Sequence, residues 1–170
     1  ASDTTGDITI GAVTGGSNNL SLSTGDNISG ADITASGAIS LGTLGLENVG
    51  GTATFSGDVD ITSLEHNSTV ANIAFTGNGS SFANAESFVN DGTLQLGNAT
   101  GDTLTFNGGL TTTSVGGTVT LQGTIATSND AVVLGAVTLA SNTTIETNAT
   151  SNAADITVAA ITGGSNTLTL

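Results

Sequence analysis

The opening pattern of the chain returns at residues 155–170. Residues 7–22 read DITIGAVTGGSNNLSL, and residues 155–170, 148 positions later, read DITVAAITGGSNTLTL. When residues 1–22 are aligned with residues 149–170, 12 of the 22 positions are identical. A pattern that restarts at a fixed interval is typical of arrays whose units stack on one another. The sequence therefore predicts one repetitive segment over residues 1–170, with a period of about 148 residues (1–148) followed by the start of the next period (149–170).

Short stretches with apolar ends and a mostly polar centre recur along the whole chain. This alternation has the period of two that is typical of a half-buried β-strand. Clusters of Gly, Asn, Asp and Ser separate the stretches and indicate turns. The twelve predicted strands are Ile8–Ile10, Leu20–Leu22, Ile39–Leu41, Ala53–Phe55, Val59–Ile61, Ile73–Phe75, Leu94–Leu96, Leu104–Phe106, Val119–Leu121, Val137–Leu139, Ile156–Val158 and Leu168–Leu170.

The spacing of these strands selects one architecture among the all-β folds. Several of them recur at a near-constant interval along the chain, for which a β-sandwich gives no reason. A right-handed parallel β-helix (β-solenoid) with about 20 residues per turn does explain the interval. It would comprise about eight turns stacked ~4.8 Å apart. The chain has no Pro, which would remove a hydrogen bond from a strand paired on both sides.

The alternation also predicts which side chains point into the coil. Residues 80–92, SSFANAESFVNDG, lack a clear alternating stretch and are expected to form a longer loop or a short helical turn over one face. The predicted inward residues are Ile8, Ile10, Leu20, Leu22, Ile39, Leu41, Val59, Ile61, Ile73, Phe75, Leu94, Leu96, Leu104, Phe106, Val119, Leu121, Val137 and Leu139.

The charge of the chain restricts its partners. There is no Lys or Arg, and the formal net charge is −14. Nucleic acids and anionic membrane surfaces are excluded as partners, because both are bound through Lys and Arg. Divalent cations and cationic partners stay possible. The longest apolar run, near residues 131–137, is far too short to span a membrane, so we expect no membrane insertion.

The sequence does not favour catalysis. Sugar-cleaving sites on β-helices generally use Arg or Lys beside the scissile bond and Trp or Tyr as platforms, and the chain has none of these. His66 is its only histidine, which without Cys or a second His cannot build a zinc site. We therefore expect no enzyme and predict that His66 is an exposed turn residue.

Acidic residues stand just before several predicted strands, at Asp7, Asp32, Asp58, Asp102 and Asp155. Calcium takes carboxylate and carbonyl oxygens as ligands, so such corners could bind it. Asp58 and Asp60, which share one strand face, are the best candidate pair. Asp is also a common turn former, and we favour turn capping over calcium; no other cofactor is expected.

The runs GDITI, NLSLSTGDNISGADITASGAISL and GGTVTLQGTI resemble the β-strand repeats of filamentous-haemagglutinin-like exoproteins and autotransporter passengers. The resemblance implies a giant bacterial surface protein folded as a parallel β-helix, with a role in adhesion or cell-surface structure. We therefore expect a structural repeat of an extracellular fibre, stalk or surface layer. Its partners would be further copies of the repeat, joined covalently or stacked end to end. The alternative is an adhesive module that binds carbohydrate or a host protein through its outer face.

Overall fold

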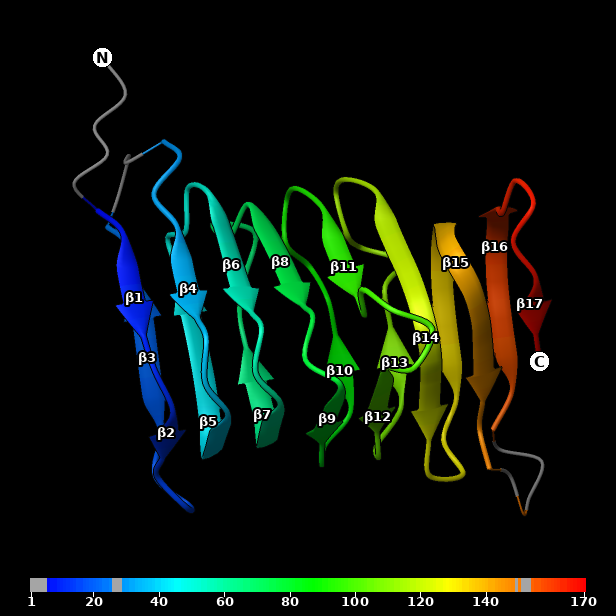
Figure 1. Ribbon diagram of the computed structural model, residues 1–170, viewed down its shortest axis with the longest axis horizontal. Coiled ribbons are helices and arrows are strands. Elements are labelled where there is room, and N and C mark those ends of the chain that lie inside the picture. Colours follow the sequence, from blue (N-terminus) through cyan, green and yellow to red (C-terminus); the bar gives the residue numbers. More distant parts are fainter. Residues whose placement is uncertain (1–5, 26–28, 149, 151–153) are drawn as a thin grey trace.

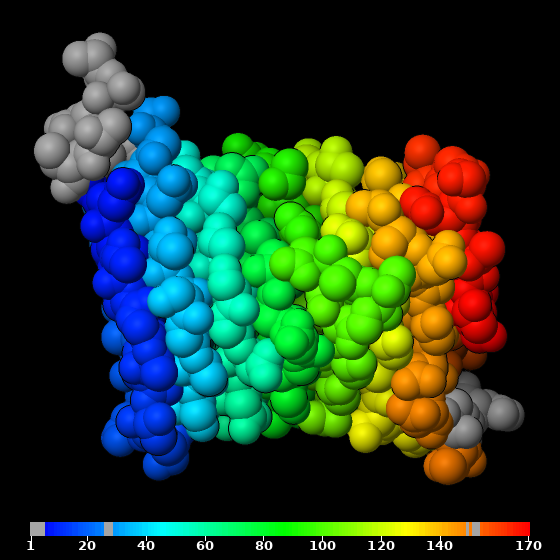
Figure 2. Space-filling model, viewed as in Figure 1, coloured from blue at the N-terminus to red at the C-terminus, as the bar shows by residue number. Residues whose placement is uncertain are grey.

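The chain folds into a single coil of short strands. The computed structural model describes residues 6–25, 29–148, 150 and 154–170, and these contain seventeen strands and no helix. Each pairing in the registers is parallel and joins a strand to the next turn of the coil. The result is a β-solenoid of about seven turns with roughly 21 residues in each. Figure 1 shows the strands lying side by side along the long axis, and the colour bands of Figure 2 follow one another in sequence order.

Each turn presents three stretches of strand, which stack into three faces. The first face begins with β1 and continues through every turn to the end of β16. We call it face 1. It consists of β1 (Ile8–Ile10), β4 (Ile33–Ala35), β6 (Thr52–Phe55), β8 (Asn72–Phe75), β11 (Leu94–Leu96), the start of β14 (Val119–Thr127), the middle of β15 (Val132–Glu146) and the end of β16 (Ile156–Thr162).

The other two faces follow in chain order within each turn, and several long strands run around a corner to serve both. Face 2 contains β2 (Val13–Thr14), the starts of β5 (Ile39–Glu47) and β7 (Val59–Glu65), β9 (Gly79–Phe82), β12 (Thr103–Phe106), the ends of β14 and β15, and β17 (Leu168–Thr169). Face 3 contains β3 (Leu20–Ser23), the ends of β5 and β7, β10 (Glu86–Ser87), β13 (Leu110–Thr111) and the starts of β15 and β16.

Apolar side chains from the three faces fill the inside of the coil. Fifteen of the eighteen predicted inward residues are buried, which confirms the assignment of faces. The exceptions, Ile8, Ile10 and Leu20, belong to the first turn and are only partly buried, since they pack against the core from one side. Phenylalanine rings stack between neighbouring turns. The ring centroids of Phe55 and Phe75 lie 5.1 Å apart.

Glycine lines the corner between face 1 and face 2. Gly37, Gly57 and Gly77 occupy equivalent places in three successive turns, just before β5, β7 and β9. A Cβ atom on Gly57 would lie 2.4 Å from the carbonyl carbon of Gly37, and one on Gly77 would lie 2.5 Å from the carbonyl oxygen of Gly57. Only glycine permits the backbone to approach this closely.

The fold differs from the sequence-based predictions in three respects. Five strands lie outside the twelve predicted stretches, namely β2, β4, β9, β10 and β13. Residues 80–92 are not a helical turn or a separate loop, because they contain part of β9 and all of β10 and continue the coil. Their Phe82 and Phe88 side chains are fully buried. The coil also has about seven turns of roughly 21 residues, fewer and slightly longer than predicted. The longest steps along face 1 join Ile8 to Ile33 and Leu94 to Val119.

Candidate binding surface

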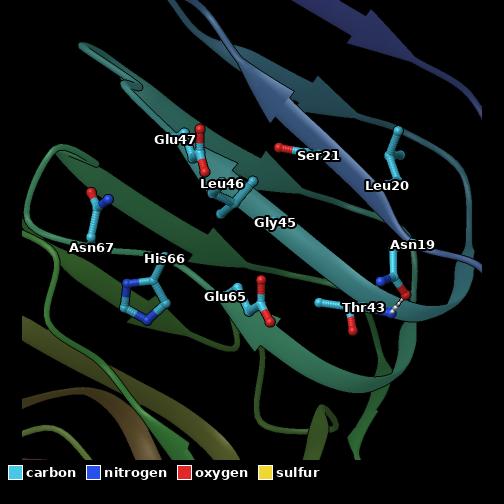
Figure 3. Close-up of a pocket in the computed structure, with 10 residues that line it drawn as sticks. All are labelled: Asn19, Leu20, Ser21, Thr43, Gly45, Leu46, Glu47, Glu65, His66 and Asn67. Carbon is cyan, nitrogen blue, oxygen red and sulfur yellow. Dashed lines mark hydrogen bonds between the residues drawn. The ribbon is translucent and has the colours of Figure 1, made fainter.

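A shallow hollow of about 440 Å³ opens on face 3, over the first three turns of the coil. Figure 3 shows its lining residues, which come from β3 and the residue before it, from β5, and from β7 and the loop that follows. Most of them are polar, and two are carboxylates. The lining residues are Asn19, Leu20, Ser21, Thr43, Gly45, Leu46, Glu47, Glu65, His66 and Asn67.

The hollow exists because a glycine interrupts an outward row of side chains. The registers place Ser21, Gly45 and Glu65 opposite one another on three neighbouring strands. A Cβ atom on Gly45 would meet Ser21 at 3.4 Å, so the missing side chain leaves a gap between Ser21 and Glu65. At one end, the Asn19 side-chain oxygen accepts a hydrogen bond from the Thr43 amide at 3.1 Å and fixes the rim. The arrangement can offer amide, hydroxyl and carboxylate groups to a polar ligand.

His66 lies at the inner edge of this hollow and is half-buried, so the prediction of an exposed turn residue was wrong. Its ring stacks on Phe88, with centroids 5.3 Å apart. Its Nδ1 atom is buried and has no hydrogen-bond partner among the residues that the structure describes. Burial lowers the pKa of His66 to about 4, so the ring is neutral at pH 7. The sequence around His66 contains no sign that Phe88, in the next turn of the coil, would cover it.

Glu86 is a buried acid that the sequence did not single out as a site. Only 4% of its surface is exposed. Its carboxylate accepts a hydrogen bond from the Leu64 amide at 2.9 Å, across a point of face 3 where no register pairs β7 with β10. Burial raises the pKa of Glu86 to about 7, against the opposing effect of the Leu64 hydrogen bond. The side chain thus supplies the acceptor that a neighbouring strand supplies elsewhere.

The calcium candidates Asp58 and Asp60 are both exposed on the outside of the third turn. The Asp58 carboxylate accepts a hydrogen bond from the Gly79 amide of the next turn at 2.9 Å. Within the described ranges, no three residues among His, Cys, Asp and Glu come together in a way that could hold a metal ion. Asp58 therefore caps a corner, as turn capping predicts, and calcium binding stays a prediction.

Other residues that precede or begin strands form the same contact. The side-chain oxygen of Asp7 accepts from the Asp32 amide at 2.9 Å, and that of Asp32 accepts from the Thr52 amide at 2.7 Å. Two turns further on, Asn72 accepts from the Thr93 amide at 2.8 Å. These acceptors link each corner to the next turn of the coil. The sequence had indicated turn formation by such residues, but not this link between turns.

No protein-family model, curated protein or solved structure matches the chain. The part of the chain that the structure describes contains no helix long and apolar enough to cross a membrane.

Proposed function

We propose that this chain is a structural repeat of a large extracellular bacterial fibre, stalk or surface-layer protein, in which it acts as a stiff spacer. The observation that carries the proposal is the uninterrupted parallel ladder of face 1, combined with the return of residues 7–22 at 155–170. Each turn of the coil pairs with the turn before through one strand edge and offers the opposite edge to the turn after. The coil can therefore be lengthened by adding turns.

Mechanical stiffness would come from two sources that run the length of the coil. Backbone hydrogen bonds join neighbouring turns, and a continuous apolar column fills the centre. A net charge of −14 without any Lys or Arg would keep separate fibres apart through repulsion.

The expectation of an extracellular bacterial location rests on the composition and on the resemblance described above. A chain without Lys or Arg has no site for trypsin-like proteases.

End-to-end association tests this proposal. Ile8 donates its amide to Asp32, and Ile10 accepts from Ser36, so the intervening Thr9 directs its backbone groups away from β4, to a side of β1 where the registers give no partner among the described residues. We expect the chain to form rods one solenoid wide, seen by negative-stain electron microscopy, and to sediment as larger species with rising concentration. Thr9→Pro removes the free amide and should suppress this growth, whereas the matched control Thr9→Val should not. A native chain that stays monomeric at all concentrations would contradict the proposal.

The hollow on face 3 favours a second candidate function, that of an adhesive module for a carbohydrate. Its amide, hydroxyl and carboxylate groups are those that hydrogen-bond sugar hydroxyls. Gly45→Thr should fill the hollow. Gly101→Ala is the matched control, because a Cβ atom there would meet nothing within 4 Å. A glycan array on which the native chain and Gly101→Ala bind one sugar, and Gly45→Thr does not, would support this function. If none of the three binds any sugar on the array, the adhesive function is rejected and the spacer function stands as the one proposal.

A further inference from the structure

The two copies of the repeated sequence lie on different faces of the coil. In the first copy, the strands that begin at Ile8, Val13 and Leu20 lie on faces 1, 2 and 3. In the second copy, the equivalent residues are 156, 161 and 168. Their register partners are Val132, Val137 and Thr143, which belong to faces 3, 1 and 2. The same sequence has therefore moved by one face.

The shift follows from the length of the period. Six register steps lead along face 1 from Ile8 to Val137, through residues 33, 53, 73, 94 and 119. Ile156, the equivalent of Ile8, comes two faces after Val137, on face 3 of the seventh turn. The repeat period thus corresponds to six and two-thirds turns, not to a whole number.

The repeated sequence keeps its local structure in both places. Gly16 and Gly164 both have φ of +57°. The amide of Asn18 donates to the Gly15 carbonyl at 3.0 Å, and that of Asn166 donates to the Gly163 carbonyl at 2.9 Å. The Gly-Gly-Ser-Asn turn therefore forms equally well at the corner between faces 2 and 3 and at the corner between faces 1 and 2.

The Asn side chain of this turn makes a different hydrogen bond in each copy. In the second copy, the Asn166 side chain donates to the carbonyl of Leu139 in the preceding turn at 2.8 Å. In the first copy, the Asn18 side chain donates to Gly15 within its own turn, at 2.8 Å. On the outer side of β1, β2 and β3 the registers give no partner strand within the described part of the chain.

We propose that the free edge formed by β1, β2 and β3 receives a second copy of the repeat unit, rotated about the fibre axis by one face. The contact of β15 with β16 and β17 is the template. In a preceding unit that ends at residue 148, the Val132 strand would pair with β1, the Val137 strand with β2 and the Thr143 strand with β3. The side chain of Asn18 would then exchange Gly15 for the Leu139 carbonyl of that copy. This inference rests on the proposed role as a fibre repeat.

The rotation fixes how an array would display its surface. At ~4.8 Å per turn, six and two-thirds turns give a rise of ~32 Å for each unit, with a rotation of about 120°. Three units would complete the cycle in ~96 Å. The hollow on face 3 would therefore face three directions in turn, with Thr167 and Thr169 in the places of Asn19 and Ser21 in each following unit.

The register at the template contact can be tested in the chain as it is, which has no native Cys. Thr138 is the register partner of Thr162, so the variant Thr138→Cys/Thr162→Cys should form an intramolecular disulfide under mild oxidation. A whole number of turns per period would instead place Thr157 beside Thr138. The variant Thr138→Cys/Thr157→Cys should stay reduced. Disulfide formation in the second variant but not in the first would overturn the rotation, whether or not the chain assembles.

The rotation in an array needs a longer chain. When a second and a third copy of residues 23–170 are added after residue 170, segment 149–170 takes the place of segment 1–22 in each following unit. With Asp60→Cys in every unit, gold labels should lie on three sides of the rod, at a spacing along its axis of ~32 Å. Labels in one row would overturn the proposal. Failure of the unmodified chain to associate would count against the fibre and not against this register.

Discussion

Face 1 and the middle of face 3 form hydrogen bonds between neighbouring turns in different ways. On face 1 the register passes without a break from Ile8 to Ile161, and the strands bond directly to one another. On face 3 no register joins β7 to β10, and side chains make the contacts between these turns. Glu86 accepts from Leu64 there, and Phe88 packs beneath His66.

Asn90, where the chain leaves this region, adds side-chain hydrogen bonds to carbonyls that backbone amides already bond. It is fully buried, and its amide nitrogen donates to the carbonyls of Ala71, Gly92 and Thr93 at 3.1, 3.2 and 3.0 Å. The comparison teaches that the coil tolerates a break in its ladder when a buried polar side chain, here that of Glu86, supplies the missing acceptor. The stability of face 1 should therefore depend on apolar packing, and that of the break on individual polar groups that can titrate.

The largest effect is expected in the apolar column behind face 1. Leu121→Asp places a charge in a fully buried site and should cost more than ~4 kcal/mol of the free energy of unfolding, with loss of structure in neighbouring turns. Thr120→Ser, the adjacent outward residue, should change it by less than ~0.5 kcal/mol. Urea denaturation followed by circular dichroism measures both. Equal effects would mean that the two faces of this strand are wrongly assigned.

The break in face 3 should respond to loss of a single acceptor. Glu86→Ala leaves the buried Leu64 amide without its partner and should cost ~1–3 kcal/mol. Glu86→Gln keeps a carbonyl oxygen in place and should cost clearly less at neutral pH. If both substitutions destabilise the chain to the same extent, the hydrogen bond is not what maintains the break.

The pH dependence of stability should separate the two titrating groups at the break. Glu86 has a folded pKa raised from 4.5 to about 7, so the folded chain holds more protons and this group's stabilising effect is lost as pH rises from about 4.5 to 7. His66 acts oppositely: its pKa is lowered from 6.5 to about 4, so its effect grows as pH rises from about 4 to 6.5.

Two variants make this visible in denaturation curves. The free energy of unfolding of Glu86→Gln, relative to that of the native chain, should increase progressively as pH rises toward 7. His66→Gln should hold a relative advantage at low pH and lose it as pH rises from about 4 to 6.5. Differences from the native chain that do not vary with pH would show that neither group is perturbed by burial.

Corner caps should matter less than either region. Asp32→Ala removes the acceptor of the Thr52 amide at an exposed corner of face 1 and should cost ~0.5–1.5 kcal/mol. Asp60→Ala removes an exposed carboxylate within β7; it is the control and should cost almost nothing. A cost at Asp60 as large as that at Asp32 would point to charge, and not capping, as the common cause.

The smallest effect is expected from calcium. Because Asp58 already accepts from Gly79, we expect the midpoint of thermal unfolding to stay within ~1 °C when calcium replaces a chelator. A larger rise that disappears in Asp58→Asn/Asp60→Asn would instead establish the pair as a calcium site.

The sequence predicted most of face 1, because strict alternation such as that of Leu94–Leu96 reveals a strand and its inward side without reference to other residues. It missed β4 (Ile33–Ala35) on this face. It failed for residues 80–92. There β9 and β10 are defined by partners far along the chain: Ser81 by Asp60 and Thr105, and Glu86 by Leu110. The hollow was equally out of reach, because the gap at Gly45 depends on which side chains the neighbouring turns place beside it.

The Gly-Gly-Ser-Asn turn that forms at two different corners has an evolutionary consequence. If the corners are interchangeable, a gene encoding such a coil can lengthen or shorten by a strand and a corner, without preserving whole turns or the assignment of faces. Duplication breakpoints are then far less constrained than in a fold with unique corners. Populations should carry alleles whose lengths differ by fractions of a turn, and selection would act on the reach of the protein while its stability stays almost constant.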